Sequence, residues 1–419
     1  MLKKIKEEAF LLQEEIVNIR RELHQIPEVG LNTKKTAAYI TNFLEDRSIP
    51  WEKNIGGSDC HSVVALIEGK YPGKCIAIRC DIDGLPLEEK TGLSFASRNG
   101  FMHACGHDAH IAITLAAAHI LNSHRENIRG SVKLIFQPAE EGSLNGPGGA
   151  KRMIDDGVLE NPRVDAVIGL HVGNIWRDPD IIPGDIGVRS GCIMSCMDRF
   201  TITAKGAGGH GAMPETAIDP ITISAQVINN VQTIISREIS PLVPAVISIC
   251  EIKSGSAFNI IPNECRMTGT IRALSNETRE YLAKRIGEIA NSVAEGMRGK
   301  IEYDFNWYGP GPVVNNDEFT AYFKKIAGEI IGAGHVKELR NPSMGGDDIA
   351  FFLEKVPGTY FFLPTSDMSK GHVIGHHNPE FILDEKPLWI GTALMSGMII
   401  SWLKREANTD LLNIDREGV

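Results

Sequence analysis

The chain has 419 residues, of which 42% are apolar and 23% are charged. This length exceeds what one compact core usually holds, so we expect two domains, and the near-average composition argues against disorder, fibres and repeats. A net charge of −10, without a long basic run, argues against nucleic acid as a partner.

The N-terminus and the cysteines both predict a cytoplasmic protein. Residues 1–23 carry charges throughout, unlike a secretory signal, and no apolar run reaches the roughly 18–20 residues that span a bilayer. The eight cysteines form no CxxC pair, which predicts free thiols rather than a disulfide framework or a common structural zinc site. Most, such as Cys75 and Cys250, lie in apolar stretches and are expected in the core, whereas Cys105 does not.

The first 190 or so residues alternate between helical and strand patterns. Residues 4–24 place apolar side chains at helical spacing until Pro27, and a second helix is predicted at 34–46. Strands are predicted at 63–67, 75–79, 132–136 and 166–170, and helices at about 108–124 and 150–156. This alternation is typical of an α/β layer structure with a largely parallel sheet flanked by helices.

The pattern changes at about Asp198. Strands at 200–204, 246–252, 266–272 and 301–305 and helices at 220–238 and 277–297 follow the order β-α-β-β-α-β of a ferredoxin-like module. After Gly309–Pro312, helices are predicted near 318–331, 348–353 and 387–403 and a strand at 359–363. We therefore predict a catalytic α/β domain at 1–193 and 308–419, interrupted by an inserted α+β lid or dimerisation domain at 194–307.

Side chains that can bind metals follow or precede four segments of the α/β domain. They are Asp81 and Asp83 after strand 75–79, Glu140 and Glu141 after strand 132–136, His171 after strand 166–170, and Cys105 and His107 before helix 108–124. Because ligands of α/β sheets gather beyond the carboxyl ends of the strands, we expect these side chains at one edge of the sheet.

Each of these residues also has an ordinary structural interpretation. The aspartates could form a turn, and Cys105 or His171 alone would more often belong to the core. Glu140 and Glu141 are different, because adjacent carboxylates after a buried strand repel each other unless a cation joins them. Taken together, the set favours a metal site.

The kinds of ligand indicate the metal and its chemistry. Thiolate, imidazole and carboxylate suit a borderline divalent ion such as manganese or zinc, with cobalt and nickel as alternatives. Two ions about 3.5–4 Å apart would share a water and lower its pKa from about 15.7 towards 7. A glutamate that binds no metal must then pass the water's proton to the leaving amine, and Glu140-Glu141 offers one glutamate for each task.

Several motifs run in order along nearly the whole chain. They are RELH at 21–24 with PE at 27–28, DIDGLP at 81–86, HACGHDAH at 103–110, QPAEEG at 137–142, GLHV at 169–172, GHGAMP at 209–214, NIIP at 259–262 and HNPEF at 377–381. With these motifs the chain resembles the aminoacylase/carboxypeptidase metallohydrolases, in the branch of auxin-conjugate, hippurate and other N-acyl-amino-acid hydrolases.

The resemblance implies roles for individual residues. It implies two divalent metal ions bound by Cys105, His107, Glu141, His171 and His377, with Glu140 as general base. Asp81 and Asp83 would then lie beside the ligands without binding metal. In the inserted module, the resemblance implies that His210 binds the scissile carbonyl, often in a neighbouring subunit, and that Asn259, Arg272 and Asp347 contact the substrate. It also implies a homodimer or homotetramer formed through the inserted domain.

Two segments depart from the family's pattern. Residues 344–348 read MGGDD where relatives usually carry Gly-Ser-Glu-Asp, which shortens a carboxylate arm near the substrate. Residues 195–198, at the hinge into the inserted module, read SCMD, which is also unusual. Neither segment contains a metal ligand, so both bear on substrate preference rather than on reaction class. Without the resemblance, His210 would be interpreted as an exposed loop residue and Arg272 as part of a surface ion pair.

The leading hypothesis is hydrolysis of the amide bond of a small N-acyl-L-amino acid. A dipeptidase or carboxypeptidase is an alternative that the sequence does not separate, because its substrates also present an amide beside a carboxylate. A cysteine hydrolase, with Cys105 as nucleophile and His107 or His110 as base, is a third possibility that leaves the glutamate pair unexplained. A binding protein with an inactive site is a fourth, against which the complete ligand set argues.

Overall fold

The computed structural model describes residues 1–142, 146–173, 178–307, 309–367 and 373–417, with side chains as far as residue 406 in the last helix. The chain divides into two compact units. Unit 1 comprises Met1–Ile193, Val314–Asn341 and Asp348–Val419, and unit 2 comprises Met194–Val313 and Pro342–Asp347. The predicted domain boundaries remain a prediction.

Unit 1 is built on an eight-stranded sheet in the order β1-β2-β4-β3-β5-β16-β6-β15. The strands are β1 (Trp51–Lys53), β2 (Val63–Glu68), β3 (Tyr71–Asp81), β4 (Arg129–Gln137), β5 (Ala166–Val172), β6 (Ile186–Val188), β15 (Val336–Glu338) and β16 (Gly358–Leu363). The central strands β4, β3, β5 and β16 run parallel, whereas β1 and β2 are antiparallel at one edge. The predicted α/β class with a mostly parallel sheet is confirmed.

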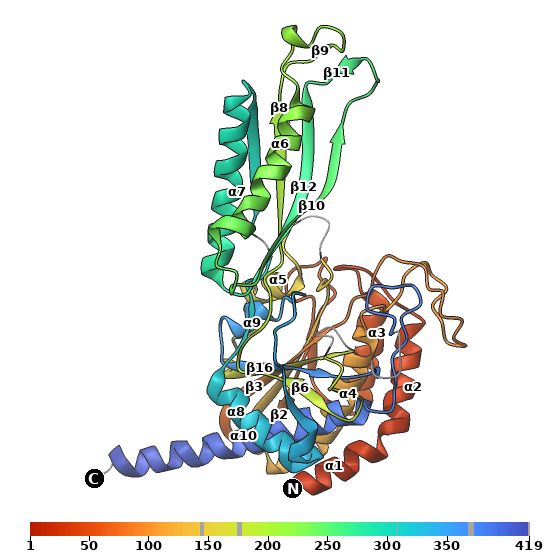
Figure 1. The fold of residues 1–419 in the computed structure, drawn as a ribbon. Helices are drawn as coiled ribbons and strands as arrows, with labels where there is room; N and C mark the ends of the chain where they lie inside the picture. Colours follow the sequence, from red (N-terminus) through yellow and green to blue (C-terminus); the bar gives the residue numbers. More distant parts are fainter. Residues whose placement is uncertain (143–145, 174–177, 308, 368–372, 418–419) are drawn as a thin grey trace. The chain divides into compact units, whose positions relative to one another are not determined.

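Helices cover both faces of this sheet (Figure 1). They are α1 (Leu2–Leu11), α2 (Gln13–His24), α3 (Lys34–Asp46), α4 (His107–Ser123), α5 (Gly149–Asp155), α8 (Asp317–Ile331), α9 (Ala350–Leu353) and α10 (Leu388–Glu417). Along β3, Ile76, Ile78 and Cys80 join the core beneath α4 and α10, while Cys75 and Ala77 join the core beneath α5 and α9. Burial on both faces explains why the central strands are continuous apolar runs.

The single helix predicted over residues 4–24 is two helices. Leu12 has φ −82° and ψ 0°, away from ideal helical values, and separates α1 from α2. Apolar periodicity alone did not reveal this break, because Ile5, Ala9, Ile16 and Ile19 are buried on both sides of it.

Unit 2 is a four-stranded antiparallel sheet in the order β10-β12-β8-β13, with two helices on one face (Figure 1). The strands are β8 (Asp198–Lys205), β10 (Ala245–Ser254), β12 (Glu264–Ala273) and β13 (Lys300–Asn306), and the helices are α6 (Pro220–Thr233), continued by a π-helical turn at Ile234–Glu238, and α7 (Asn276–Gly296). Short strands β9 (Gly209–His210) and β11 (Ile260–Ile261) pair with each other within unit 2. Strands β7 (Gly191–Met194) and β14 (Val313–Asn315) pair where the chain passes from one unit to the other.

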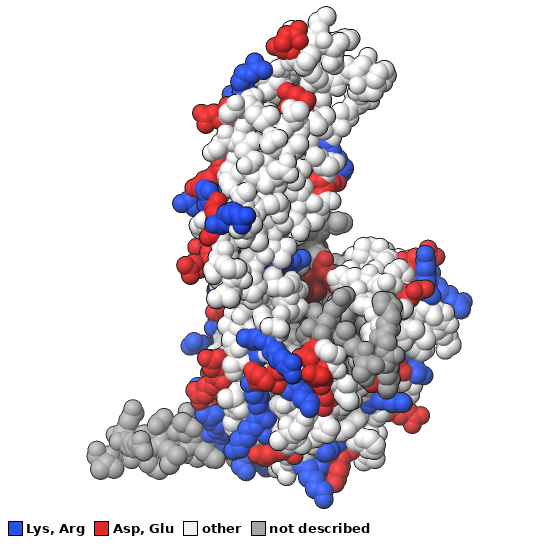
Figure 2. All heavy atoms as spheres, viewed as in Figure 1, with Lys and Arg blue, Asp and Glu red and all other residues white. Residues whose placement is uncertain are grey.

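The helices of unit 2 begin at side chains that cap their first turns. Asp219 accepts the backbone N–H groups of Ile221 and Thr222 at the start of α6, and Ser275 accepts that of Thr278 at the start of α7. On the molecular face drawn in Figure 2, acidic and basic side chains are interspersed. Among the described helices, none combines the length and the apolar character needed to cross a membrane.

Candidate metal centre

Four segments of unit 1 bring chemical groups to the carboxyl ends of its central strands. Asp81 is the last residue of β3 and pairs with Gln137, the last residue of β4, from which the chain continues to Glu140 and Glu141. His171 lies near the end of β5, which runs parallel to β3. The segment before α4 completes the set. The parallel strands thus place these groups at one edge of the sheet, as the sequence predicted.

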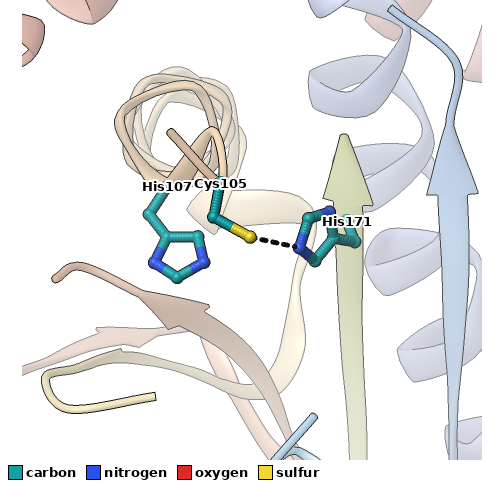
Figure 3. Close-up of side chains that lie close together, drawn as sticks. All are labelled: Cys105, His107 and His171. Carbon is teal, nitrogen blue, oxygen red and sulfur yellow. Dashed lines mark hydrogen bonds between the residues drawn. The ribbon is translucent and has the colours of Figure 1, made fainter. Parts of the chain in front are cut away.

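Cys105 and His171 face each other. The Sγ atom of Cys105 lies 3.4 Å from Nε2 of His171, and Figure 3 shows the thiol directed at the imidazole from the segment that precedes α4. His171 donates its Nδ1 proton to the carbonyl of Val172 at 2.6 Å, so its Nε2 is the nitrogen that can accept. Both groups are buried and present a lone pair to the same point.

His107 has one nitrogen fixed and one without a partner. Its Nδ1 donates to the backbone carbonyl of Asp83 at 2.8 Å. Its Nε2 is buried and makes no hydrogen bond with any described group, although Asp81 Oδ2 and Glu140 Oε2 lie 3.8 Å away and Glu141 Oε1 lies 4.0 Å away. Distances of this size are too long for hydrogen bonds and leave room for a cation among the four groups.

The donor atoms form overlapping triads. Those of Cys105, His107 and His171 lie within 4.8 Å of one another, as do those of Cys105, Glu141 and His377, and those of His107, Glu140 and Glu141. His377 Nε2 is 3.1 Å from Glu141 Oε1, and its half-exposed ring marks the open side of the cluster. A set of thiol, imidazole and carboxylate donors suits borderline divalent ions.

The carboxylate of Asp83 fixes the backbone of both glutamates. Its carboxylate accepts the backbone N–H of Glu140 at 3.0 Å and that of Glu141 at 3.2 Å. Its own carbonyl accepts the proton of His107 Nδ1. A single buried aspartate therefore orients three of the donor residues without occupying the position between them.

Asp81 accepts hydrogen bonds from two side chains. Arg79 Nη1 donates to Asp81 Oδ2 at 2.8 Å, and His110 Nδ1 makes a short hydrogen bond to Asp81 Oδ1. His110 Nε2 accepts the N–H of Val172 at 2.9 Å, so both of its ring nitrogens are engaged. His110 can therefore support the site but has no free nitrogen with which to act as the base of a cysteine hydrolase.

The charges of the site shift its pKa values. Burial lowers the pKa of His107, but Asp81 and Asp83 outweigh burial and raise that pKa to about 10. Burial, together with Glu141 and Glu140, raises the pKa of the Cys105 thiol well above its usual value. Burial also holds the pKa of His171 well below its usual value. A divalent cation would allow the thiolate and the carboxylates to be ionised side by side.

The other predicted site residues lie in unit 2. His210 is an exposed residue of β9, paired with Ile260, and the N–H of Gly211 donates to the carbonyl of Asn259 at 2.8 Å, so His210 and Asn259 share one end of the unit. Arg272 lies near the end of β12, where its Nη1 is buried without a hydrogen bond to any described group. Asp347 is the buried last residue of unit 2.

Comparison with known proteins decides the family. The sequence profile of peptidase family M20/M25/M40 matches residues 77–401. The chain belongs to this family. The predicted resemblance is thereby confirmed, and so is the class of metal-dependent hydrolase acting on amide bonds.

Individual M20 relatives cover almost the whole chain. The N-acetylcysteine deacetylase of Bacillus subtilis is 36% identical over 391 residues, or 92% of this chain and 96% of the relative. Thermostable carboxypeptidase 1 of Saccharolobus solfataricus is 38% identical over 392 residues, or 93% and 96%. The crystal structure of a dinuclear metal-binding M20 peptidase from Bacillus subtilis matches with a TM-score of 0.77 and 32% identity, and the match covers 94% of this chain and 99% of that one.

The structure also reveals supporting residues of the M20 site that the sequence analysis did not single out. Arg79, 1% exposed, donates its Nε to Gln137 Oε1 at 2.8 Å and its Nη2 to Asp348 Oδ1 at 2.5 Å, in addition to its bond with Asp81. Gln137 Nε2 in turn donates to Asp348 Oδ2 at 2.8 Å. The sequence feature that could have revealed these residues is Arg79 itself, an arginine inside an otherwise apolar strand, because a buried charge requires polar partners.

Proposed function

We propose that this M20 enzyme hydrolyses the amide bond of N-acyl-L-amino acids, with an acetyl, benzoyl or similar acyl group, to a carboxylic acid and a free amino acid. The observation that carries the proposal is the buried, unpartnered Nε2 of His107, which faces Glu140 and Glu141 beside the Cys105–His171 pair. The 36% identity to an enzyme named N-acetylcysteine deacetylase supports this substrate class.

The donor residues fit two divalent ions. Cys105, His107, Glu141, His171 and His377 would hold them, and manganese or zinc would suit these donors, with cobalt or nickel as alternatives. When bound, such ions polarise the acyl oxygen and lower the pKa of a water molecule. The relative described as a dinuclear metal-binding peptidase supports a count of two.

Glu140 is proposed as the general base. Its carboxylate lies beside the cluster, 3.8 Å from His107 Nε2, and its backbone is fixed by Asp83. From there it can take a proton from the attacking water and give it to the nitrogen of the leaving amino acid. Glu141, whose carboxylate also contacts His377, is left as the ligand of the pair.

Residues of unit 2 are proposed to bind the substrate. We assign the scissile carbonyl and its developing oxyanion to His210, and the amide to Asn259. The substrate's carboxylate is assigned to Arg272, and Asp347 is proposed as a further residue that contacts the substrate. A buried guanidinium N–H without a partner supports the assignment of Arg272, because such a group favours an anion. His210 would act in its own or in a neighbouring subunit.

The assembly and location of the enzyme are also proposals. We propose that residues 194–307 form an inserted domain, and that homodimers or homotetramers form through it. The ten-residue strand β10 is an edge of the sheet of unit 2 and carries exposed Val246 and Ile252, which supports association there. All eight cysteines are free thiols, which supports a reducing compartment such as the cytoplasm.

Two rival activities remain to be separated by experiment. The 38% identity to a protein named thermostable carboxypeptidase favours peptide substrates as the second candidate. Cys105 as a nucleophile is disfavoured, because burial and the neighbouring glutamates raise the pKa of its thiol and keep it protonated. Of the two candidate bases, His110 has no free nitrogen, whereas Nε2 of His107 is unpartnered, so the chelation test decides against or for this candidate.

The test is release of amino acid from N-acetyl-L-methionine, from hippurate and from a dipeptide, with added manganese and after chelation. The proposal expects release from the N-acyl substrates that chelation abolishes and manganese restores. Release from the dipeptide alone would transfer the assignment to the peptidase candidate. Release that survives chelation, but not iodoacetamide, would establish the cysteine mechanism instead.

A further inference from the structure

The C-terminal end of α2 contacts two segments that lead to proposed metal ligands. The guanidinium of Arg20, 1% exposed, places its Nε 2.8 Å from Oδ2 of Asp108, the residue that follows His107. Its Nη1 donates to Oε1 of Glu385 at 3.2 Å. Glu385 belongs to the segment that runs from His377 to the start of α10. One buried arginine therefore joins two ligand-bearing parts of unit 1 that are far apart in the sequence.

The segment that carries His377 has no regular secondary structure of its own. Residues 373–387 contain neither helix nor strand. His377 has a φ of +60°, which a residue other than glycine adopts only where its surroundings impose it. Its N–H donates to the carbonyl of Ala104 at 2.9 Å, and the carbonyl of Pro379 accepts the N–H of Lys90 at 2.8 Å. The position of this ligand therefore depends on contacts with other parts of unit 1.

Asp108 offers the guanidinium a fixed partner. Oδ2 of its carboxylate also lies 2.7 Å from Nδ1 of His24, one turn after Arg20 in α2, and Nε2 of His24 lies 3.2 Å from Oε1 of Glu89. The side chains of Asp108, His24 and Glu89 are withdrawn from water. Because Asp108 directly follows His107 at the start of α4, the segment before this helix is held in place from α2.

Glu385 is the other partner of the guanidinium. Its carboxylate also accepts hydrogen bonds from Nε and Nη2 of Arg21, at 3.0 and 2.6 Å. The Arg21 side chain is 45% exposed, so water and salt screen its charge, whereas the charge of Arg20 is buried and little screened. We therefore expect Arg20, rather than Arg21, to determine where Glu385 lies.

We propose that Arg20 is a positioning residue for metal binding, which fixes His377 through its contact with Glu385. The inference rests on the proposed function, whose metal ligands it concerns, and deepens it. Without the guanidinium, residues 377–385 lose their buried link to the segment before α4, and the imidazole of His377 moves away from the other donors.

The contact with Arg20 should matter for one of the two ions. The donor atoms of Cys105, Glu141 and His377 lie within 4.8 Å of one another, as do those of Cys105, His107 and His171. The second group comes from β5 and from the segment before α4, and it does not include the imidazole of His377. Displacement of His377 should therefore weaken the binding of one ion and leave the other bound.

The experiment adds manganese to the metal-free full chain and counts the ions that bind. Calorimetry measures their affinities, atomic emission measures their number, and electron paramagnetic resonance distinguishes a pair of neighbouring manganese ions from a single one. In Arg20→Lys, which cannot reach Asp108 and Glu385 together, and in Glu385→Ala, the affinity for the second ion should fall about 10–100-fold. The first ion should bind as in the wild type.

Two variants elsewhere in unit 1 match these substitutions. Arg47→Lys changes an arginine whose Nη2 lies 2.6 Å from Oε1 of Glu15 in α2, away from the ligand segments. Glu318→Ala removes a carboxylate of α8 that lies 2.6 Å from Nη2 of Arg405. Both controls should bind two manganese ions with the affinities of the wild type.

The number of bound ions decides between the outcomes. A selective loss of the second ion in the folded variants, verified by thermal unfolding of the metal-free proteins, supports the inference, and Glu385→Ala decides alone if Arg20→Lys does not fold. Two ions bound with wild-type affinities, or an equal weakening of both, would overturn it, because Arg20 would then only stabilise the fold. A wild type that binds two ions but hydrolyses no N-acyl amino acid would overturn the proposed function and leave the inference standing. A wild type that binds fewer than two ions would overturn the inference.

Discussion

The carboxylate of Asp83 accepts the backbone N–H of Glu140 at 3.0 Å. Because the neighbouring N–H of Glu141 reaches the other oxygen of the same carboxylate, the position of the glutamate pair depends on a residue that donates nothing to the metal.

Replacing Asp83 by Asn should weaken the site without removing a ligand. An amide has one acceptor oxygen, so its NH2 group would face one of the two backbone N–H groups. Metal affinity or activity should fall about 10–100-fold, as measured by titration of the metal-free protein and by steady-state kinetics. Asp180→Asn, at an exposed position, is the control. Unchanged affinity and rate in Asp83→Asn would refute the supporting role.

Glu140→Ala should separate metal binding from catalysis. If Glu140 is the base, kcat should fall by about 10²–10⁴-fold while the metal content, measured by atomic emission, stays at the wild-type value. Glu141→Ala should instead lose metal. Glu295→Ala, exposed on α7, controls for the loss of a carboxylate elsewhere. Near-normal turnover in Glu140→Ala would end the assignment.

Arg79→Lys should be destabilising although it preserves the charge. A lysine cannot reproduce the three separate hydrogen bonds to Gln137, Asp81 and Asp348, so at least one of these buried groups loses a partner. We expect a loss of about 3 kcal/mol in the free energy of unfolding of unit 1, measured by denaturant titration. The exposed Arg340→Lys serves as the comparison and should change little.

The buried ion pairs of Asp108 predict a pH dependence of stability. Burial alone would raise the pKa of Asp108, but Arg20, 2.8 Å away, and His24, 2.7 Å away, hold it far below its usual value. The pairs therefore stabilise the fold above the pKa of an unfolded aspartate, about 3.9, and this contribution declines as the pH falls from there towards the folded pKa.

Asp108→Asn tests this sign. The variant should unfold at a lower temperature than the wild type at pH 7, and the difference should shrink as the pH falls below about 4. Thermal unfolding of both proteins at several pH values measures it, with the exposed Asp155→Asn as control. A difference that grows on acidification would contradict the assignment of the pairs.

The sequence predicted the elements that carry strong local patterns. The apolar runs of β3, β4 and β5 predicted the strands whose carboxyl ends form one edge of the sheet. The polar side chains that follow these strands lie together at that edge, as expected. Three-residue strands such as β6 and β15 escaped prediction, because so few residues show no periodicity.

Local sequence patterns do not predict contacts between residues that are far apart in the chain. Arg79 and Asp348 are 269 residues apart, and neither periodicity nor motif spacing pairs them. The same holds for His110, whose two hydrogen bonds exclude it as a base only once Asp81 and Val172 are placed around it. The roles of the metal ligands and of the unit 2 residues stay predictions until the variants are measured.

The buried thiol of Cys105 has a consequence for how the enzyme would acquire its metal. With a pKa raised well above the usual value, the thiol carries its proton at neutral pH, whereas a metal ligand must be a thiolate. On the proposed assignment, loading the enzyme therefore releases a proton to the solvent, and apparent metal affinity rises about tenfold per pH unit for each proton released. Acidification therefore weakens metal binding, because protons compete with the ion for the sulfur of Cys105.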